Sequence, residues 1–237
     1  MAATGDAGVT APGSGPDAAA VVVVLAKQPR AGRSKTRLQS LFTPAQAAEL
    51  AAACLGDTLA VVRSCRVGRR VLAWEGDPAG YDAGFEVVGQ PPGSLNDRLA
   101  AAFRAARRLV ADGDGGVLLI GMDTPQVTAA LLDVDWQGAD ALLGPSEDGG
   151  FWVIGLRDVD PGPVFAGIPM SSDRTGAAQL ARLHELGLSV RLLPSLRDVD
   201  TPEDAAAVAA GHPRLGFSAR YRMLLDEVRR PGPVSGS

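Results

Sequence analysis

The sequence has little cysteine and histidine, with two of each among 237 residues. Cys54 and Cys65 match no zinc or disulfide spacing, so we interpret both as small buried residues of a protein in a reducing cytoplasm. His184 and His212 have no serine or acid at a spacing typical of a hydrolase. The scarcity of these residues argues against a zinc site, a disulfide framework and a hydrolase triad.

Long apolar runs and a positive net charge are also missing. Residues 21–26 are too few to cross a bilayer, and no later run approaches the roughly 20 residues that a spanning helix needs. The formal net charge is -4, which argues against nucleic acid as a partner. We therefore expect a cytoplasmic protein that acts on small molecules, with no membrane segment; the oligomeric state stays open.

The order of apolar runs predicts one α/β domain. Residues 20–26 form a continuous apolar run rich in valine, which is typical of a central strand buried on both faces of a parallel sheet. Strand-like and helix-like segments then alternate, which predicts a three-layer α/β/α fold with a mostly parallel sheet. We expect a disordered tail at residues 1–19, a transferase domain at 20–211, and a C-terminal helix with a loose tail at 212–237. The apolar face of residues 218–229 could dock on the domain or on a second subunit, and we expect the domain.

The tripeptide Asp-Thr-Pro occurs twice, at Asp123-Thr124-Pro125 and at Asp200-Thr201-Pro202. Threonine is a good N-cap and proline suits the first helical turn, so each copy predicts a helix start with an acid just outside it. Asp198 lies two residues before Asp200, so both carboxylates should point the same way in an extended segment. Either these acids only favour the positive ends of helix dipoles, or Asp123, Asp198 and Asp200 hold Mg²⁺ or Mn²⁺. We favour the metal, and leave open which of Asp198 and Asp200 ligates it.

A basic segment follows the first predicted strand and contains five cations within eleven residues, from Lys27 to Arg37. Gly32 permits a tight backbone path, and Lys27, Lys35 and Arg37 can meet phosphate oxygens. The alternative is a solvated charged loop. The segment is not a P-loop, because Ser34 and Pro29 stand where that motif needs glycine. No dinucleotide-binding glycine pattern follows any predicted strand.

A second loop combines acids with glycines in Glu147-Asp148-Gly149-Gly150. It is either a simple turn before a strand or the place where an acceptor binds. Asp148 or Glu147 could bind an acceptor hydroxyl, act as a base, or hold metal. Further on, Ser171 and Arg174 precede a predicted helix. The predicted acceptor-binding residues are Glu147, Asp148, Gly149, Gly150, Ser171 and Arg174.

Four motifs in this order resemble a bacterial family of GT-A-type, glycosyltransferase-like proteins, which is similar to the 2-phospho-lactate guanylyltransferases. The motifs are Lys35-Thr36-Arg37-Leu38, Gly121-Met122-Asp123-Thr124-Pro125, Glu147-Asp148-Gly149-Gly150 and the acidic run from Arg197 to Asp204. The resemblance covers about residues 21–210. It implies the nucleotide-diphospho-sugar transferase fold, with Asp123 and the Asp198/Asp200 pair at a divalent metal. The chain departs from the guanylyltransferases at Gly149-Gly150-Phe151, where they have Gly-Gly-Thr.

These observations lead to three hypotheses for function. The first is transfer of a nucleoside monophosphate from a nucleoside triphosphate to a small phosphorylated or phosphonate acceptor, with release of pyrophosphate. The surplus of cations in the basic segment favours it, since a triphosphate carries more charge than a sugar diphosphate. The expected catalytic residues are Lys35, Arg37, Asp123 and Asp148. The second is glycosyl transfer from a nucleotide sugar, and the third is a non-catalytic nucleotide-binding protein.

Overall fold

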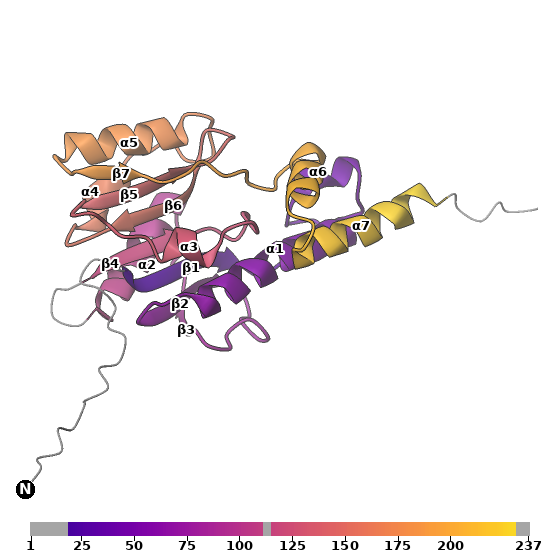
Figure 1. The fold of residues 1–237 in the computed structure, drawn as a ribbon, viewed down its shortest axis with the longest axis horizontal. Helices are drawn as coiled ribbons and strands as arrows, with labels where there is room; N and C mark the ends of the chain where they lie inside the picture. The colour runs from indigo at the N-terminus through magenta and orange to yellow at the C-terminus, as the bar shows by residue number, and fades with distance from the viewer. Residues whose placement is uncertain (1–18, 111–114, 231–237) are drawn as a thin grey trace, which may run out of the picture.

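The computed structural model describes residues 19–110 and 115–230. The predicted N-terminal tail, apart from Ala19, and the loose C-terminal end lie outside the described residues. Within the described residues, the chain forms one sheet with helices on both of its faces (Figure 1).

The sheet has seven strands in the order β3-β2-β1-β4-β6-β5-β7. Strand β6 runs antiparallel to its neighbours β4 and β5, and all other pairings are parallel. The prediction of a mostly parallel sheet with a central first strand is therefore confirmed. The strands are β1 (Ala19–Lys27), β2 (Arg69–Glu75), β3 (Glu86–Gly89), β4 (Gly116–Ile120), β5 (Ala141–Pro145), β6 (Phe151–Leu156) and β7 (Val190–Leu192).

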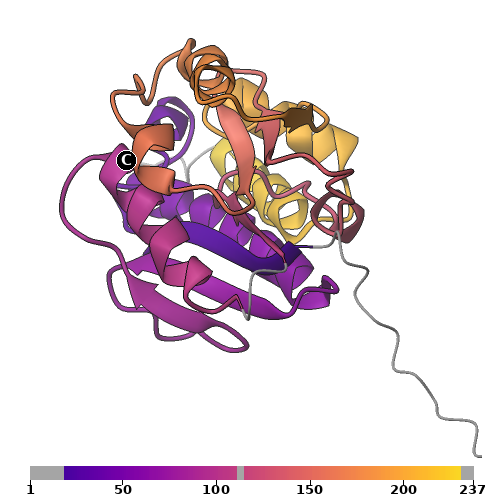
Figure 2. The ribbon, with the colours of Figure 1, turned by 90° about the vertical axis from the view of Figure 1, so that its left-hand side faces the viewer.

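Two apolar clusters lie on opposite faces of the sheet. Helices cover both faces, so the fold has three layers (Figures 1 and 2). Val22 and Val24 of β1 face the cluster that contains α1, and Val21 and Val23 face the cluster that contains α2, α4 and α5. This alternation follows from the two-residue period of a strand. The helices are α1 (Pro44–Ser64), α2 (Leu95–Arg107), α3 (Ala129–Leu132), α4 (Pro161–Phe165), α5 (Thr175–Glu185), α6 (Pro202–Gly211) and α7 (Gly216–Arg229), with a short 3-10 helix η1 (Thr36–Ser40).

A third apolar cluster joins α6 and α7 to η1 and the beginning of α1, at one end of the molecule (Figure 1). Phe217, Tyr221 and Leu224 of α7 are buried in it. The expected docking of the C-terminal helix on its own chain is therefore confirmed. Two further members of the cluster, Leu38 and Val199, belong to the predicted charged segments.

Helix α1 is long and apolar enough to cross a membrane, by length and composition only: it has 21 residues and a mean hydropathy of 1.3. In the structure its side chains Leu55, Leu59 and Val62 are buried against the sheet, and Leu50 is buried in the third cluster. A helix of the protein core passes the same test, and α1 has the contacts of a core helix.

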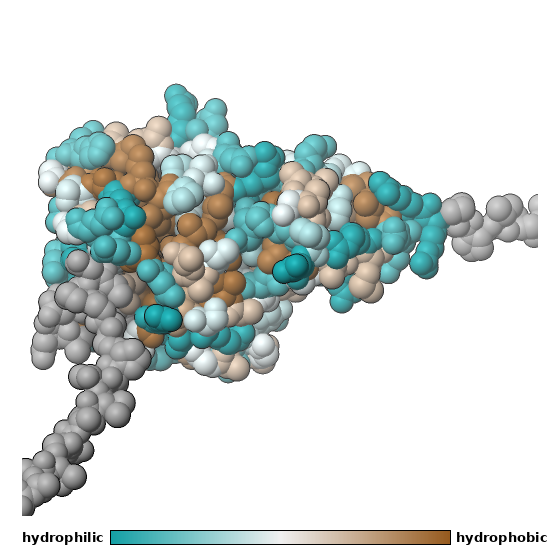
Figure 3. Space-filling view, viewed as in Figure 1, coloured by the Kyte–Doolittle hydropathy of each residue, from teal (hydrophilic) through white to brown (hydrophobic). Residues whose placement is uncertain are grey.

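Exposed large apolar side chains are spread over several elements. The most exposed large ones are Met223 on α7 (55%) and Leu192 on β7 (54%). On the face shown in Figure 3, polar side chains surround the apolar groups. Such scattered exposure is ordinary for a folded chain.

The two Asp-Thr-Pro copies fold differently. At the second copy Thr201 caps α6: its hydroxyl accepts from the backbone N–H of Asp204, whose carboxylate accepts in return from the N–H of Thr201. At the first copy the predicted helix start is wrong, because α3 begins only at Ala129. The hydroxyl of Thr124 donates a hydrogen bond to Asp198 and does not cap a helix. Helix α4, which contains Pro161, Gly162 and Pro163, was not predicted, since its composition is typical of a loop.

Candidate active site

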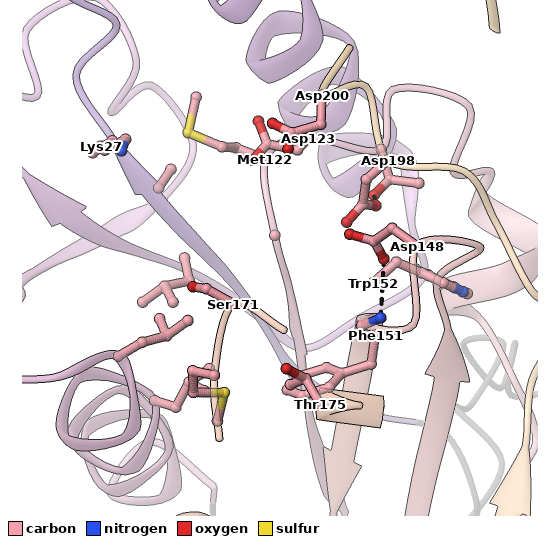
Figure 4. Close-up of a pocket in the computed structure, with 18 of the residues that line it drawn as sticks. Lys27, Met122, Asp123, Asp148, Phe151, Trp152, Ser171, Thr175, Asp198 and Asp200 are labelled. Atoms are coloured by element: carbon pink, nitrogen blue, oxygen red, sulfur yellow. Dashed lines mark hydrogen bonds between the residues drawn. The ribbon is translucent and has the colours of Figure 1, made fainter. Parts of the chain in front are cut away.

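A cavity of about 660 Å³ lies at the edge of the sheet where β1 and β4 end (Figure 4). Its lining includes predicted residues from distant parts of the sequence: Lys27, Lys35, Arg37, Asp123, Asp148, Gly150, Ser171, Asp198 and Asp200. The carboxyl edge of an open α/β sheet is where such folds bind ligands. The structure therefore brings the basic segment and the acidic segments to one cavity.

The backbone conformation of Lys35 and its ion pair with Asp123 fix the lysine side chain in the cavity. Its φ of 49° lies in the left-handed region, which is uncommon for a residue other than glycine. The Nζ atom lies 2.6 Å from Oδ1 of Asp123, and the Lys35 side chain is only 5% exposed. Burial acts to lower the pKa of Lys35, but attraction to Asp123, the hydrogen bond to its carboxylate and further nearby charges such as Asp200 together outweigh burial, and the net shift is upward. Lys35 therefore stays charged beside Asp123.

A second ion pair joins the same two segments nearer the surface. Nη1 of Arg37 lies 2.8 Å from Oδ2 of Asp200, and the two side chains are 71% and 40% exposed. Exposed pairs of this kind contribute little to stability. The guanidinium of Arg37 can therefore exchange Asp200 for another anion at low cost.

Asp198 is half-buried beside other charged side chains. The hydroxyl of Thr124 donates a hydrogen bond to its Oδ1 at 2.5 Å. Burial raises the pKa of Asp198 to about 6, and repulsion from Asp123 and Asp148 adds to the shift, while Thr124 and Lys35 oppose it. Three carboxylates from three loops thus influence one another at one side of the cavity.

Backbone and side-chain bonds fix the segment that contains Asp198 and Asp200. The N–H of Val199 donates to the carbonyl of Asp123 at 2.9 Å, and Nε2 of Gln126 donates to the carbonyl of Arg197 at 2.6 Å. The Arg197 guanidinium forms ion pairs with Glu147 and with Asp204 on α6. The segment is thereby held between the loop after β4 and the loop before β6.

Four of the predicted site residues are not among those that line the cavity: Gly32, Glu147, Gly149 and Arg174. The carboxylate of Glu147 is paired with Arg197. Gly149 has a φ of +89°, and a Cβ atom there would lie 2.0 Å from the carbonyl oxygen of Asp173, so only glycine fits. A ligand-binding role for these four residues stays a prediction.

A polar part of the cavity, which lies between β1, β2 and α2, was not predicted from the sequence. Nε2 of Gln90 donates to the carbonyls of Ala26 and Ala73, and Arg98 pairs with Glu75 at 2.5 Å. Gln90 directly follows β3, at the same edge of the sheet as Lys27. Gln90 follows a predicted strand and precedes two prolines, and this position could have indicated a residue at the ligand edge of the sheet.

The acids fit a divalent cation whose coordination the substrate completes. Within residues 19–110 and 115–230, no three His, Cys, Asp or Glu side chains are grouped so that they could hold a metal by themselves. Mg²⁺ is usually bound through one or two carboxylates together with water and substrate phosphates. The repulsion around Asp198 is also what a bound cation would relieve. Asp123 and Asp198 are suitable ligands that line the cavity; Asp123 is also paired with Lys35, as Asp200 is with Arg37.

The chain is similar in sequence to known proteins. Residues 50–172 match the family described as uncharacterized protein conserved in bacteria (DUF2064). Two phosphoenolpyruvate guanylyltransferases, from Mycobacterium sp. strains KMS and MCS, are each 30% identical over 232 residues, covering 94% of this chain and 99% of theirs.

Solved structures show the same fold. A protein from Desulfovibrio desulfuricans G20, assigned as a nucleotide-diphospho-sugar transferase, superposes with a TM-score of 0.78 at 26% identity, covering 88% of this chain and 96% of its own. A cytidylyltransferase from Leptospira borgpetersenii shares the fold at 13% identity, with a TM-score of 0.53 and coverage of 89% and 94%. The resemblance seen in the sequence is confirmed, and the chain is a transferase. The chain belongs to the DUF2064 family, and it is similar in sequence to the phosphoenolpyruvate guanylyltransferases.

Proposed function

We propose that this protein transfers a nucleoside monophosphate from a nucleoside triphosphate to a small acceptor and releases pyrophosphate. The observation that supports it most directly is the meeting of Lys35 with Asp123 in a cavity that Asp198 also lines. A buried lysine beside carboxylates suits a metal-bound triphosphate. The lysine attracts phosphate oxygens, and the carboxylates attract the metal ion.

The chain's part in the reaction is positioning and charge neutralisation. Lys27 at the end of β1, together with Lys35 and Arg37, would bind the triphosphate oxygens and stabilise the pyrophosphate as it leaves. A divalent cation held by Asp123 and Asp198 would neutralise further negative charge on the phosphates. Holding donor and acceptor in one closed geometry supplies much of the rate enhancement in such reactions.

The donor base in this proposal is guanine, since both curated relatives are guanylyltransferases that align over nearly their whole length. The test is calorimetric titration of the protein with α,β-methylene analogues of GTP, ATP, CTP and UTP in the presence of Mg²⁺. We expect the GTP analogue to bind at least about tenfold more tightly than the others, a difference of about 1.4 kcal/mol. No binding of any analogue would overturn the proposal.

Glycosyl transfer is the second candidate, because the structure from Desulfovibrio desulfuricans G20 is assigned as a nucleotide-diphospho-sugar transferase. The same cavity could hold the diphosphate of a nucleotide sugar. The two reactions differ in their products. Acceptor-dependent release of pyrophosphate from GTP supports nucleotidyl transfer, whereas release of a nucleoside diphosphate from a GDP-sugar or UDP-sugar supports glycosyl transfer.

A further inference from the structure

The acids of the cavity are not equally open to a metal ion. Oδ1 of Asp123 is in contact with the ammonium group of Lys35, whereas no lysine, arginine or histidine among the described residues forms an ion pair with Asp198. Figure 4 shows the carboxylates of Asp123 and Asp198 at the same side of the cavity, with Lys27 apart from them. A metal ion can therefore approach Asp198 directly, but at Asp123 it meets the charge of Lys35.

The folding of the basic segment places Lys35 at Asp123. In the turn before the lysine, the hydroxyl of Ser34 accepts from the N–H of Arg30 at 2.9 Å. In the turn after it, the carbonyl of Lys35 accepts from the N–H of Leu38 at 2.9 Å. Ser34 and Leu38 are both buried. Lys35 thus extends into the cavity from backbone that is anchored on both sides, so its contact with Asp123 is a feature of the folded segment.

The carboxylate of Asp123 is open to the cavity, while most of the Lys35 side chain is buried. The side chain of Asp123 is 44% exposed and that of Lys35 only 5%. A divalent cation at Asp123 would therefore share the carboxylate with a largely buried ammonium group. Two cations on one carboxylate repel each other, and burial strengthens the repulsion because less water screens it.

A phosphate group reverses this relation. Its several anionic oxygens can accept from the ammonium group of Lys35 and bind a metal ion at the same time. Lysine holds its charge on a flexible four-carbon stem, so Nζ can turn from Asp123 to a phosphate oxygen while the anchored backbone stays in place. The carboxylate of Asp123 is then available to the metal ion. One side chain therefore opposes metal binding without phosphate and supports it with phosphate.

We propose that Lys35 couples metal binding to phosphate binding. The ammonium group occupies Asp123 until a phosphate of the ligand takes it up, and Asp123 then binds the divalent cation. Such coupling is reciprocal, so the metal ion raises the affinity for nucleotide by the same factor by which nucleotide raises the affinity for metal. The inference rests on the proposed function in one respect, that a phosphate-bearing ligand and a metal ion share the cavity. It holds equally for a nucleotide-sugar donor.

Two other cations of the cavity provide matched comparisons. Arg37 and Asp200 are 71% and 40% exposed, so water and salt screen their ion pair. Removing the charge of Arg37 should therefore change metal affinity less than removing the charge of Lys35. Lys27 is the second comparison, since it lines the same cavity but lies apart from Asp123 (Figure 4).

The test is titration of the protein with Mn²⁺ alone, followed by the electron paramagnetic resonance signal of the free ion. We expect Lys35→Met to bind Mn²⁺ at least about tenfold more tightly than the wild type, because methionine fills the path of the lysine stem without its charge. Lys35→Arg keeps the charge and should bind Mn²⁺ as weakly as the wild type. Arg37→Met and Lys27→Met lose the same charge and should each gain less than about threefold.

A double-mutant cycle separates competition at Asp123 from a general effect of charge. In an Asp123→Asn background there is no carboxylate to compete for, so adding Lys35→Met should give no such gain in Mn²⁺ affinity. An equal gain in this background would overturn the inference. Equal affinity of the wild type and Lys35→Met, or no binding of Mn²⁺ to Lys35→Met, would also overturn it. Lys35→Gln takes the place of Lys35→Met if the methionine variant does not fold.

Nucleotide binding should change in the opposite direction. With Mg²⁺ present, Lys35→Met should bind the α,β-methylene GTP analogue about tenfold or more weakly than the wild type, because the phosphate loses its ammonium partner. Tighter binding of both Mn²⁺ and the analogue would overturn the inference, since Lys35 would then only repel the metal ion. Failure of the wild type to bind the analogue would instead reject the proposed function. The Mn²⁺ titration would still test Lys35 in that case, so the two failures are distinguishable.

Discussion

The hydroxyl group of Thr124 donates a hydrogen bond to Oδ1 of Asp198 at 2.5 Å, across 74 positions of the sequence. The bond fixes the orientation of a carboxylate that we expect to bind the metal. Replacing Thr124 by valine keeps the shape but removes the donor. Loss of such an outer contact should raise the Mg²⁺ concentration for half-maximal binding of the GTP analogue by about tenfold or more.

Thr128→Val is the matched control for this change, because Thr128 is exposed and its side chain makes no capping bond. Thr124→Ser should restore the wild-type Mg²⁺ dependence. An unchanged dependence in Thr124→Val would show that Asp198 needs no such support.

Removing Lys35 should weaken binding of the triphosphate. Hydrogen bonds to charged groups are worth about 1.5 to 3 kcal/mol, so Lys35→Ala should reduce affinity for the GTP analogue by about 10- to 100-fold. Arg33→Ala is the control, since Arg33 belongs to the same segment but does not line the cavity. Equal losses in both variants would indicate a general effect of charge rather than a contact by Lys35.

Asp123→Ala should abolish turnover and also lower stability while leaving the protein folded. The buried ammonium group of Lys35 would lose its partner, at a cost of about 1 to 3 kcal/mol in the free energy of unfolding. Adding Lys35→Met to this variant should recover stability but not activity. Asp200→Ala breaks only the exposed pair with Arg37 and should cost less than about 1 kcal/mol. Denaturant unfolding measures the stability of all three variants. A rescue of activity by Lys35→Met would show that Asp123 is not needed for turnover.

Asp140, a hydrogen-bonded acid outside the cavity lining, should make the free energy of unfolding depend on pH. Hydrogen bonds from the side chain and the N–H of Ser189 lower the pKa of Asp140. A lowered folded-state pKa means that the stabilisation exists above the unfolded pKa of about 4 and is lost as pH falls below it. Asp140→Asn should therefore destabilise the protein by about 1 kcal/mol at pH 7, and the difference should shrink towards pH 3.

Unfolding of wild type and Asp140→Asn across this pH range tests the sign. Asp82→Asn is the control, since the structure shows no hydrogen bond to the Asp82 carboxylate among the described residues. A difference that grows in acid would contradict the assignment.

Phe217 should be a main support of the C-terminal helix. Its side chain is fully buried (0% exposed), and replacing a buried phenylalanine by alanine costs about 3 to 5 kcal/mol. Met223 on the same helix is 55% exposed, so Met223→Ala should be nearly neutral. Similar melting temperatures for the two variants would mean that α7 packs less tightly than the structure shows.

Much of the fold could be predicted because the local signals agree with one another. The continuous apolar run became the central strand β1, and Thr201 with Pro202 opened α6 as expected. The first Asp-Thr-Pro copy was misread because the Thr124 hydroxyl, which would accept from a backbone N–H in a helix cap, donates to Asp198 instead. A cap is a local interaction that sequence spacing can suggest, whereas the bond to Asp198 depends on tertiary structure.

The sequence predicted the types of residue in the cavity better than their contacts. Lys35, Asp123 and Asp198 do meet, since the ends of neighbouring strands bring distant loops together. Glu147 belongs to the predicted acidic loop but pairs with Arg197, and spacing alone could not separate it from Asp148. Gln90 was missed because a single glutamine after a strand has no distinctive pattern.

The third apolar cluster links the C-terminal helix to ligand binding. Leu38 comes directly after Arg37, and Val199 separates Asp198 from Asp200; both are fully buried together with Phe217. The segment with Arg37 and the segment with Asp198 and Asp200 are therefore held by the same apolar cluster outside the sheet. Unfolding of this cluster would release both segments together. We therefore expect nucleotide affinity to be lost on heating before the central sheet unfolds.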